Sequence, residues 1–189
     1  MTRASTHHRL LLAAAALALL AGCTLGVAEN SPGGGAINIE TVPLVDVAER
    51  QPAPDVCGET LEGDELCLAD LTGTPVLVNF WASWCGPCAA EVPELVDVAD
   101  AYDGQVSVIG VNTQDSRTNA RSFERDQGVD YPSFFDPGAA IAAQFGGIAP
   151  EALPSTILVD ADGGIAVRLL GAVSRPQLEP YLAELIADA

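Results

Sequence analysis

Two cysteines separated by two residues, Cys85 and Cys88, lie where a buried strand gives way to a helix in NFWASWCGPCAAEVPEL (79–95). The start of a helix offers free N–H groups and a partial positive charge, and both stabilise a thiolate, the nucleophile of disulfide exchange. Two intervening residues allow Cys88, one turn further along, to attack a mixed disulfide and release the product. Pro87 suits the first turn, because the donor that it lacks would be unpaired there. The spacing therefore predicts a redox-active dithiol.

The first 22 residues are typical of an export signal. Arg3 and Arg9 give a positive start, and Leu10 to Ala21 is an apolar run too short to span a bilayer. The run ends in LAGC, which resembles the bacterial lipoprotein signal, in which the cysteine, here Cys23, is lipidated and becomes the first residue. The alternative is an ordinary signal peptide with Cys23 there by chance. The lipoprotein interpretation predicts a lipid anchor on the extracytoplasmic face of a membrane, in the cell envelope.

The cysteine count agrees with export. Lipidation of Cys23 would leave four of the five cysteines, which makes two pairs in a compartment where disulfides persist. Residues 23–54 contain Pro- and Gly-rich linker stretches and are expected to form a flexible tether, with a short accessory strand in INIETVPLVDV (37–47). Residues 55–189 are long enough for one domain with a core of its own.

The mature chain is strongly acidic and contains no histidine. Loss of the signal leaves six Arg against 26 acids, a side-chain charge of −20, which disfavours nucleic acid as a partner. Without histidine, Ser-His-Asp and Cys-His catalysis and His-ligated metals are excluded, and a copper chaperone would be expected to have a His ligand. Cys88 is followed by Ala89 rather than His, which argues against haem attachment. We expect no cofactor and no metal.

Two other roles for Cys85 and Cys88 remain open. A zinc site could combine them with Cys57 and Cys67, although the spacing between the pairs is irregular and an oxidising compartment disfavours free thiolates. A purely structural disulfide is the second alternative.

The hydrophobic periodicity alternates along the domain. Continuous apolar runs predict buried strands at 75–82 and 106–112, and a short extended piece follows at 131–135. Helical spacing appears at 86–102, 117–127, 139–145 and 176–187. Residues 155–171 read as a hairpin around an Asp-Gly turn. This order predicts an α/β fold, a central mixed β-sheet with helices on both faces.

FWASWCGPC resembles the active-site segment of the thioredoxin superfamily. With CAAEVPEL, YPSFFDP, LPSTILVDADG and the lipoprotein-type signal, the chain resembles the TlpA/ResA type of envelope-anchored thioredoxin-like proteins from Val56 to Ile186. The resemblance implies a thioredoxin-like fold in which Cys85 is the attacking thiol, Cys88 the resolving thiol and Pro154 a cis-proline facing them. It also implies a substrate-binding surface around the cysteines, where the Leu153 backbone pairs with a substrate strand; this surface comprises Trp84, Gly86, Pro87 and Leu153.

The chain departs from thioredoxins in two places. The buried Asp that thioredoxins carry in the strand before the active site is replaced by Asn79. The loop FGGIAPEALPS before Pro154 is also longer than the common pattern, and because it borders the active site, substrate preference does not carry over.

The resemblance implies an extracytoplasmic, membrane-anchored thiol–disulfide oxidoreductase. It would reduce disulfides of exported partner proteins, with apocytochrome c among them, and a membrane thiol–disulfide donor would supply electrons. The Gly-Pro dipeptide between the cysteines does not fix the reduction potential, so an oxidant or isomerase acting on exported proteins is an alternative. A redoxin-type thiol peroxidase and a redox-inert lipoprotein scaffold are further alternatives. We expect a monomer.

Glu91 follows Cys88 by three residues, on the apolar stripe of the predicted helix. It is either solvated at the rim and inert, or buried beside Cys88. Burial would raise its pKa toward the range needed to move the proton of the resolving cysteine. The family's Glu-x-Pro pattern and the absence of the strand Asp favour the second interpretation.

Cys57 and Cys67 flank GETLEGDEL, where the resembling proteins have an N-terminal β-hairpin. A two-residue turn would leave the cysteines out of register, whereas a three-residue loop with Gly63 in the left-handed conformation pairs Cys57 with Cys67. Such partners lie within disulfide reach. We predict a structural disulfide without a role in turnover; unpaired cysteines and a second redox couple acting in relay are the alternatives.

Overall fold

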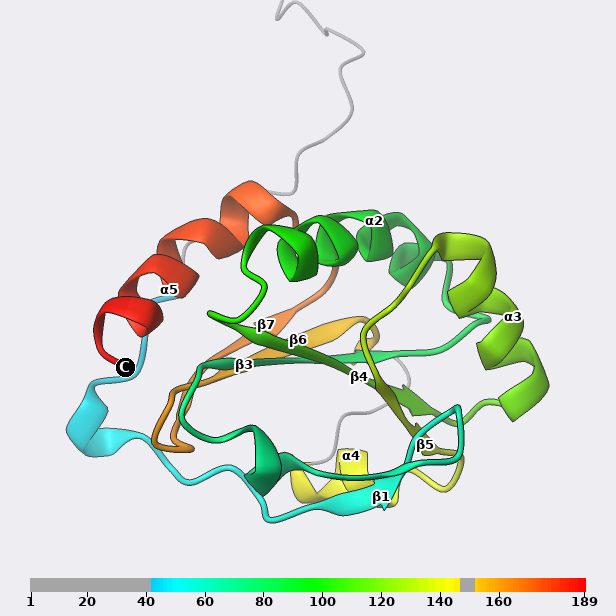
Figure 1. Cartoon of the computed structure of the whole chain (residues 1–189), viewed down its shortest axis with the longest axis horizontal. Helices are drawn as coiled ribbons and strands as arrows, with labels where there is room; N and C mark the ends of the chain where they lie inside the picture. Colours follow the sequence, from blue (N-terminus) through cyan, green and yellow to red (C-terminus); the bar gives the residue numbers. More distant parts are fainter. Residues whose placement is uncertain (1–41, 147–151) are drawn as a thin grey trace, which may run out of the picture. The chain divides into compact units, whose positions relative to one another are not determined.

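The structure, a computed structural model, describes residues 42–146 and 152–189 (Figure 1). The signal segment, the lipidation candidate Cys23 and residues 147–151 of the long loop before Pro154 lie outside the described residues. None of the helices within the described ranges is long and apolar enough to cross a membrane.

A five-stranded mixed sheet lies at the centre, with the strand order β5-β4-β3-β6-β7. The central strand β3 (Val76–Trp81) runs parallel to β4 (Ser107–Thr113) and antiparallel to β6 (Ser155–Val159). The outer strands are β5 (Ser133–Asp136), parallel to β4, and β7 (Ile165–Leu170), antiparallel to β6. Every residue of β3 is buried, including the polar Asn79, which confirms the strand predicted from its largely apolar run.

Helices cover both faces of this sheet, as the sequence predicted (Figure 1). One face carries α2 (Gly86–Ala101), α3 (Arg117–Gln127) and α5 (Arg175–Ala187), and the other carries the short α4 (Ala140–Gln144). A 3₁₀ helix, η2 (Leu68–Leu71), lies on the α4 side. The order of strands and helices from β3 to α5 therefore matches the predicted order.

Each face has its own apolar core. Between the sheet and α4 lies a cluster centred on the large buried side chains Phe80, Phe134 and Phe145. Between the sheet and helices α2 and α5 lies a second cluster, which includes Leu77, Leu95, Leu158, Leu178, Leu182 and Leu185. Alternate residues of β3 face the two cores, because successive side chains of a strand point to opposite faces.

Residues 42–54 run along the outer side of β7. Val45 N–H donates to the Ala166 carbonyl at 2.8 Å, and Ile165 N–H donates to the Gln51 carbonyl at 2.8 Å. The Tyr181 hydroxyl on α5 donates to the Val42 carbonyl at 2.7 Å. We call residues 42–54 the strap. Among the described residues, contacts with the domain are thus made from Val42 onward, ahead of the boundary at Asp55 that the composition suggested.

The accessory strand expected in residues 37–47 is not formed within the described part of that stretch. Residues 42–46 adopt no strand, and a 3₁₀ helix, η1 (Val47–Glu49), begins where the strand was expected to end. The reason is local: the Asp46 carboxylate accepts the Ala48 N–H at 3.0 Å and caps the turn.

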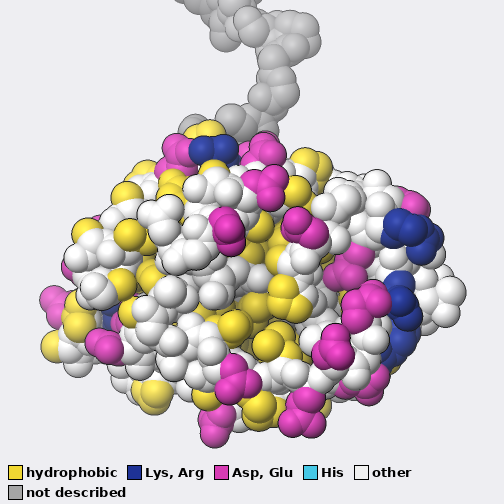
Figure 2. Space-filling view, in the orientation of Figure 1, with side chains coloured by type: hydrophobic (Ala, Val, Ile, Leu, Met, Phe, Trp, Pro, Cys, Tyr) yellow, Lys and Arg dark blue, Asp and Glu magenta, His cyan; other side chains and the backbone are white. Residues whose placement is uncertain are grey.

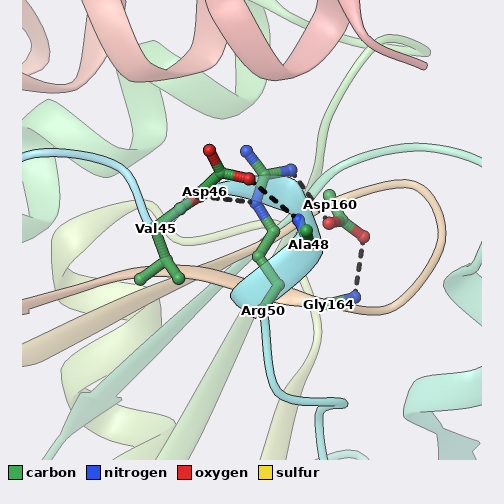
Figure 3. Close-up of polar contacts among 6 residues, drawn as sticks. All are labelled: Val45, Asp46, Ala48, Arg50, Asp160 and Gly164. Atoms are coloured by element: carbon green, nitrogen blue, oxygen red, sulfur yellow. Dashed lines mark hydrogen bonds and ion pairs between the residues drawn. The ribbon is translucent and has the colours of Figure 1, made fainter.

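One ion pair fastens the strap (Figure 3). The Arg50 guanidinium donates to the Asp160 carboxylate at 2.9 Å and to the Val45 carbonyl at 3.0 Å. The second Asp160 oxygen accepts the Gly164 N–H at 2.7 Å, within the β6–β7 turn. The two charged side chains are only 5% and 11% exposed.

We expect Arg50→Ala to lower the free energy of unfolding by about 3 kcal/mol, because it leaves the Asp160 carboxylate in a mostly buried position without its counter-charge. Urea denaturation measures this change. Arg121→Ala is the matched control: its ion pair with Glu62 is 48% and 62% exposed, and such exposed pairs contribute less than about 1 kcal/mol. Equal losses in the two variants would contradict the special role of Arg50.

The N-terminal hairpin is confirmed, with strands β1 (Cys57–Glu59) and β2 (Glu65–Cys67). Its register pairs Cys57 with Cys67, and the Thr60 N–H donates to the Asp64 carbonyl at 2.7 Å, as the three-residue loop requires. Gly63 has a φ of 101°, in the region that favours glycine.

The tip of this hairpin covers the outer side of β5. Thr60 forms a bridge with Phe134, and the Leu61 N–H donates to the Ser133 carbonyl at 2.8 Å. Arg117 on α3 holds the tip in place, since its guanidinium donates to the carbonyls of Thr60 and Leu61 at 2.6 and 2.8 Å. The hairpin is therefore tied both to the sheet and to α3.

Candidate active site

Cys85 and Cys88 form a disulfide at the start of α2, just beyond the end of β3. Cys85 is the N-cap residue, and its sulfur accepts the Cys88 N–H at 3.2 Å. The residue Cys85 is 6% exposed, whereas Cys88 is completely buried. The helix start therefore offers a hydrogen-bond donor to the Cys85 sulfur, and Cys85 is the more exposed of the two cysteines.

Both cysteines belong to a small apolar cluster that we call the active-site cluster, made of Leu61, Trp81, Ala82, Cys85, Cys88 and Ala120. Trp81 stacks on Phe123 of α3, with ring centroids 4.9 Å apart. Leu61 comes from the tip of the N-terminal hairpin. Sequence reasoning did not foresee that this hairpin reaches the redox centre.

The residues proposed for substrate binding surround Cys85. Trp84 is 53% exposed, and Gly86 and Pro87 are exposed beside it. Leu153 is partly buried and packs against the active-site cluster. The Leu153–Pro154 peptide bond is cis, which is the geometry that the resemblance implied. These side chains are thus brought together at one end of the sheet.

Glu91 lies beneath the cysteines rather than at the rim. It is 1% exposed, on the buried face of α2 and one turn beyond Cys88. Burial raises its pKa to about 7, against the opposing effect of two donors, the Val173 N–H at 2.9 Å and the Asn79 side-chain amide at 3.0 Å. A carboxyl group with this pKa can accept or release a proton near neutral pH.

Asp115 is a site residue that sequence reasoning missed. Its carboxylate accepts from the Ser83 N–H at 2.6 Å, the Ser83 hydroxyl at 3.0 Å, the Asn112 amide at 3.1 Å and the Ser116 N–H at 2.7 Å. The neighbouring Gln114 carbonyl accepts the Trp84 indole N–H at 3.0 Å. Residues 114–115 thereby fix the loop that leads into Cys85. The sequence did contain a signal for Asp115, because it follows β4 and Cys85 follows β3. Adjacent parallel strands such as β3 and β4 end at the same edge of a sheet, so residues that follow them lie close together.

We expect Asp115→Ala to lower the free energy of unfolding by about 2 kcal/mol, since several donors lose a charged acceptor. The freed loop should also let iodoacetamide alkylate reduced Cys85 faster than in the wild type. Ser83→Ala is the control, because it removes one of these bonds and keeps the charge. If both variants alkylate at the wild-type rate, Asp115 does not hold the loop.

The second disulfide joins Cys57 to Cys67 across the hairpin, outside the active-site cluster. Each of the four described cysteines is thus in a disulfide. Within residues 42–146 and 152–189, no three His, Cys, Asp or Glu side chains gather in a way that could hold a metal ion.

We expect the Cys57→Ala/Cys67→Ala double variant to unfold at a lower temperature and to keep its exchange activity. The disulfide closes a short loop, with a sequence separation of 10, so the loss should be about 2 to 3 kcal/mol on a chain-entropy estimate. Thermal unfolding and insulin reduction measure the two effects. An inactive double variant with an intact fold would instead indicate a relay between the two disulfides.

The surface around these elements is acidic (Figure 2). Acidic side chains are spread over the face shown, whereas basic ones gather mainly at the edge where α3 lies. Four of the six arginines within the described residues pair with an acid on another turn or element: Arg50, Arg117, Arg121 and Arg175. Such a surface favours partners with a neutral or basic docking face.

Comparison with known proteins agrees with this geometry. Residues 50–168 match the AhpC/TSA family. The chain belongs to this family. It is 31% identical over 134 residues to the thiol-disulfide oxidoreductase ResA of Bacillus thuringiensis (strain Al Hakam). The aligned region covers 70% of this chain and 76% of that protein.

Solved structures point the same way. A DsbF homologue from Corynebacterium diphtheriae is 35% identical, with a TM-score of 0.72 over 82% of this chain and 96% of that one. A secreted thiol-disulfide isomerase from Corynebacterium glutamicum is 31% identical, with a TM-score of 0.73 over 83% and 95%. The thioredoxin-like fold is therefore confirmed, and this member of the AhpC/TSA family is a thiol–disulfide oxidoreductase of the ResA type.

Proposed function

We propose that this oxidoreductase is anchored through a lipid on Cys23 to the extracytoplasmic face of a membrane, where it reduces disulfides of exported partner proteins. A membrane thiol–disulfide donor would pass two electrons to the Cys85–Cys88 disulfide. The resulting dithiol would pass them to a partner, and apocytochrome c is the partner class implied by the resemblance to the TlpA/ResA type. The residues upstream of the strap would act as the tether.

The observation that carries this proposal is the asymmetry of the cysteine pair. Cys85 is the more exposed and accepts a helix N–H, whereas Cys88 is buried one turn before Glu91. In the proposed cycle the Cys85 thiolate attacks a partner disulfide, and the first partner sulfur leaves as a thiolate. Cys88 then gives its proton to the Glu91 carboxylate and attacks the Cys85 sulfur, so the second partner sulfur leaves and the Cys85–Cys88 disulfide forms. Trp84, Gly86, Pro87 and the Leu153 backbone would hold the partner strand.

The reduction potential tests the direction of electron flow. Equilibration of residues 42–189 with glutathione buffers should give a value near that of thioredoxin, about −270 mV. A value near about −120 mV would instead support an oxidant. Isomerase activity is kept as a second candidate because the similar protein of Corynebacterium glutamicum is described as a secreted isomerase; refolding of scrambled ribonuclease tests it.

Two further measurements address the other parts of the proposal. Mass spectrometry of the full chain expressed in a bacterium should find a diacylglyceryl group on Cys23, and Cys23→Ala should release the protein from the membrane. Peroxide turnover tests the peroxidase alternative. We expect no turnover, because a thiol peroxidase needs a peroxidatic cysteine within the peroxidase sequence motif, and we see no such motif in this sequence.

A further inference from the structure

A buried amide next to Glu91 is only half satisfied. Asn79 on β3 is completely buried, and its side-chain N–H₂ group donates to the Glu91 carboxylate at 3.0 Å and to the Thr156 hydroxyl at 3.1 Å. The Asn79 carbonyl oxygen has no hydrogen-bond partner within the described residues. Buried polar groups without a partner are rare and costly, so this one calls for a physical explanation.

The arrangement suits only one protonation state of Glu91. Both carboxylate oxygens accept N–H groups, one from Asn79 and the other from Val173. A protonated Glu91 would carry an O–H that needs an acceptor, and in this orientation Asn79 offers it a donor. The acid form would then leave two groups unpaired, its own O–H and the Asn79 carbonyl.

A half-turn of the amide gives the O–H of Glu91 an acceptor and leaves one group unpaired instead of two, because the Asn79 N–H₂ group then lies where the carbonyl oxygen now has no partner within the described residues. The two ends of an asparagine amide are nearly equal in size, so the same site accommodates both orientations. After the turn, the Asn79 carbonyl accepts the O–H of Glu91. It also accepts the Thr156 hydroxyl, which can donate as well as accept. Thr156 is the residue paired with Asn79 across β3 and β6, so it faces the amide in either orientation.

We propose that Asn79 is a positioning residue whose amide turns over when Glu91 gains or loses a proton, presenting N–H to the carboxylate and C=O to the acid. The link to turnover rests on the proposed function, in which Glu91 receives the proton of Cys88. The response of the amide itself does not depend on exchange activity.

Few other titratable groups face Glu91. On its own helix these are Glu94, which accepts the Arg175 N–H at 2.8 Å, and Cys88, which is held in a disulfide and does not titrate in the oxidised protein. Tyr131, ahead of β5, is a third; burial and then the Glu91 charge raise its pKa, so it stays neutral through the neutral range. The two hydrogen-bond partners of Glu91, Asn79 and Val173, and the Thr156 hydroxyl bonded to Asn79 carry no charge. The neutral-range titration of this buried site is therefore that of Glu91, for which burial gives a pKa of about 7.

Side-chain amide NMR of the oxidised protein tests the proposal. Above the Glu91 titration, a coupling through the hydrogen bond should join the Asn79 amide nitrogen to the Glu91 carboxyl carbon. Below it, this coupling should vanish, and the Asn79 amide protons should shift upfield with the same midpoint as that carbon. The proposal is overturned if the coupling persists below the Glu91 titration, or if the chemical shifts of the Asn79 amide protons do not change across it.

The chain supplies a matched internal control. Asn112 is also completely buried, donates its amide N–H to a carboxylate, that of Asp115, and has an unpartnered carbonyl oxygen within the described residues. Its signals should not follow the Glu91 midpoint. Glu91→Gln should hold Asn79 in the turned orientation at every pH, because a Gln amide donates a hydrogen atom as the acid does. If the Asn79 amide protons of this variant resonate where they do in the wild type above the Glu91 titration, the proposal is contradicted.

Asn79→Leu separates positioning from a merely structural role. The charged form of Glu91 loses its stronger, charge-assisted bond, so the Glu91 midpoint should move up by about one pH unit. A variant that is less stable but keeps the midpoint would indicate a structural role only. Because the carboxyl carbon is observed directly, failure here is distinguishable from failure of the reductase proposal, which the reduction potential tests.

Discussion

Cys85→Ser should lose all detectable thiol–disulfide exchange, and Cys88→Ser should accumulate mixed disulfides with its partners. The reason is the difference in exposure: Cys85 at the helix start is 6% exposed, whereas Cys88 is completely buried. Without Cys88, nothing displaces the partner from Cys85. Non-reducing electrophoresis followed by mass spectrometry of the trapped species measures this outcome and identifies the partners.

The control is to make both substitutions in the Cys57→Ala/Cys67→Ala background. Trapping that survives there must occur at the remaining cysteine of the active site. Equal trapping by the two serine variants would mean that the nucleophile has been assigned to the wrong cysteine.

Glu91→Gln should slow the resolution of the mixed disulfide at neutral pH by about 100-fold, within the usual range for loss of a general base. Burial raises the pKa of Glu91 to about 7, so in the wild type the base form appears as pH rises through that value. The rate of resolution should rise through the same range, and Glu91→Gln should lose this inflection. Stopped-flow fluorescence on a preformed mixed disulfide measures the profile; an unchanged inflection in the variant would exclude Glu91 as the base.

The pH dependence of the free energy of unfolding should also reflect the titration of Glu91. The pKa of Glu91 is about 7 in the folded chain, against an ordinary value of 4.5, so the folded state holds an extra proton between these two values. Stability is therefore fully present below about pH 4.5 and falls as pH rises through about 7, by about 3 kcal/mol in all. Glu91→Gln removes this cost, so the variant should resist urea better than the wild type at about pH 9 and show a flatter profile across the window.

The central sheet was predicted well from the sequence because the pattern of each strand is contained in a short stretch of residues. The largely apolar run of β3 and the Asp-Gly turn between β6 and β7 can be recognised without knowledge of distant residues. The hairpin register was also accessible, since a loop with one left-handed glycine fixes which residues face each other. Cys85 and Cys88 were found for the same reason: their chemistry depends on a short spacing at a helix start.

Contacts between distant segments were the part that sequence could not supply. Arg50 and Asp160 are 110 positions apart, and Arg117 reaches the carbonyl of Thr60 across 57 positions. No local pattern distinguishes these arginines from solvated ones. The strap was assigned to a linker because its Pro-rich composition is typical of linkers, whereas its hydrogen bonds to β7 are set by the tertiary fold. Asn79 was noted only as a departure from thioredoxins, because its partners Glu91 and Thr156 lie on other elements.

The strap and the hairpin tip have a joint effect on how this protein can meet other chains. An outer strand of a sheet normally exposes a row of N–H and C=O groups that invites another strand to add, and proteins that are secreted and crowded must guard against the resulting aggregation. Here the strap lies along β7 and the hairpin tip lies along β5, so the N-terminal 26 described residues protect both borders of the sheet. A variant that begins at Asp55 would keep every active-site residue and lose the strap, which covers β7. It should therefore self-associate through β7.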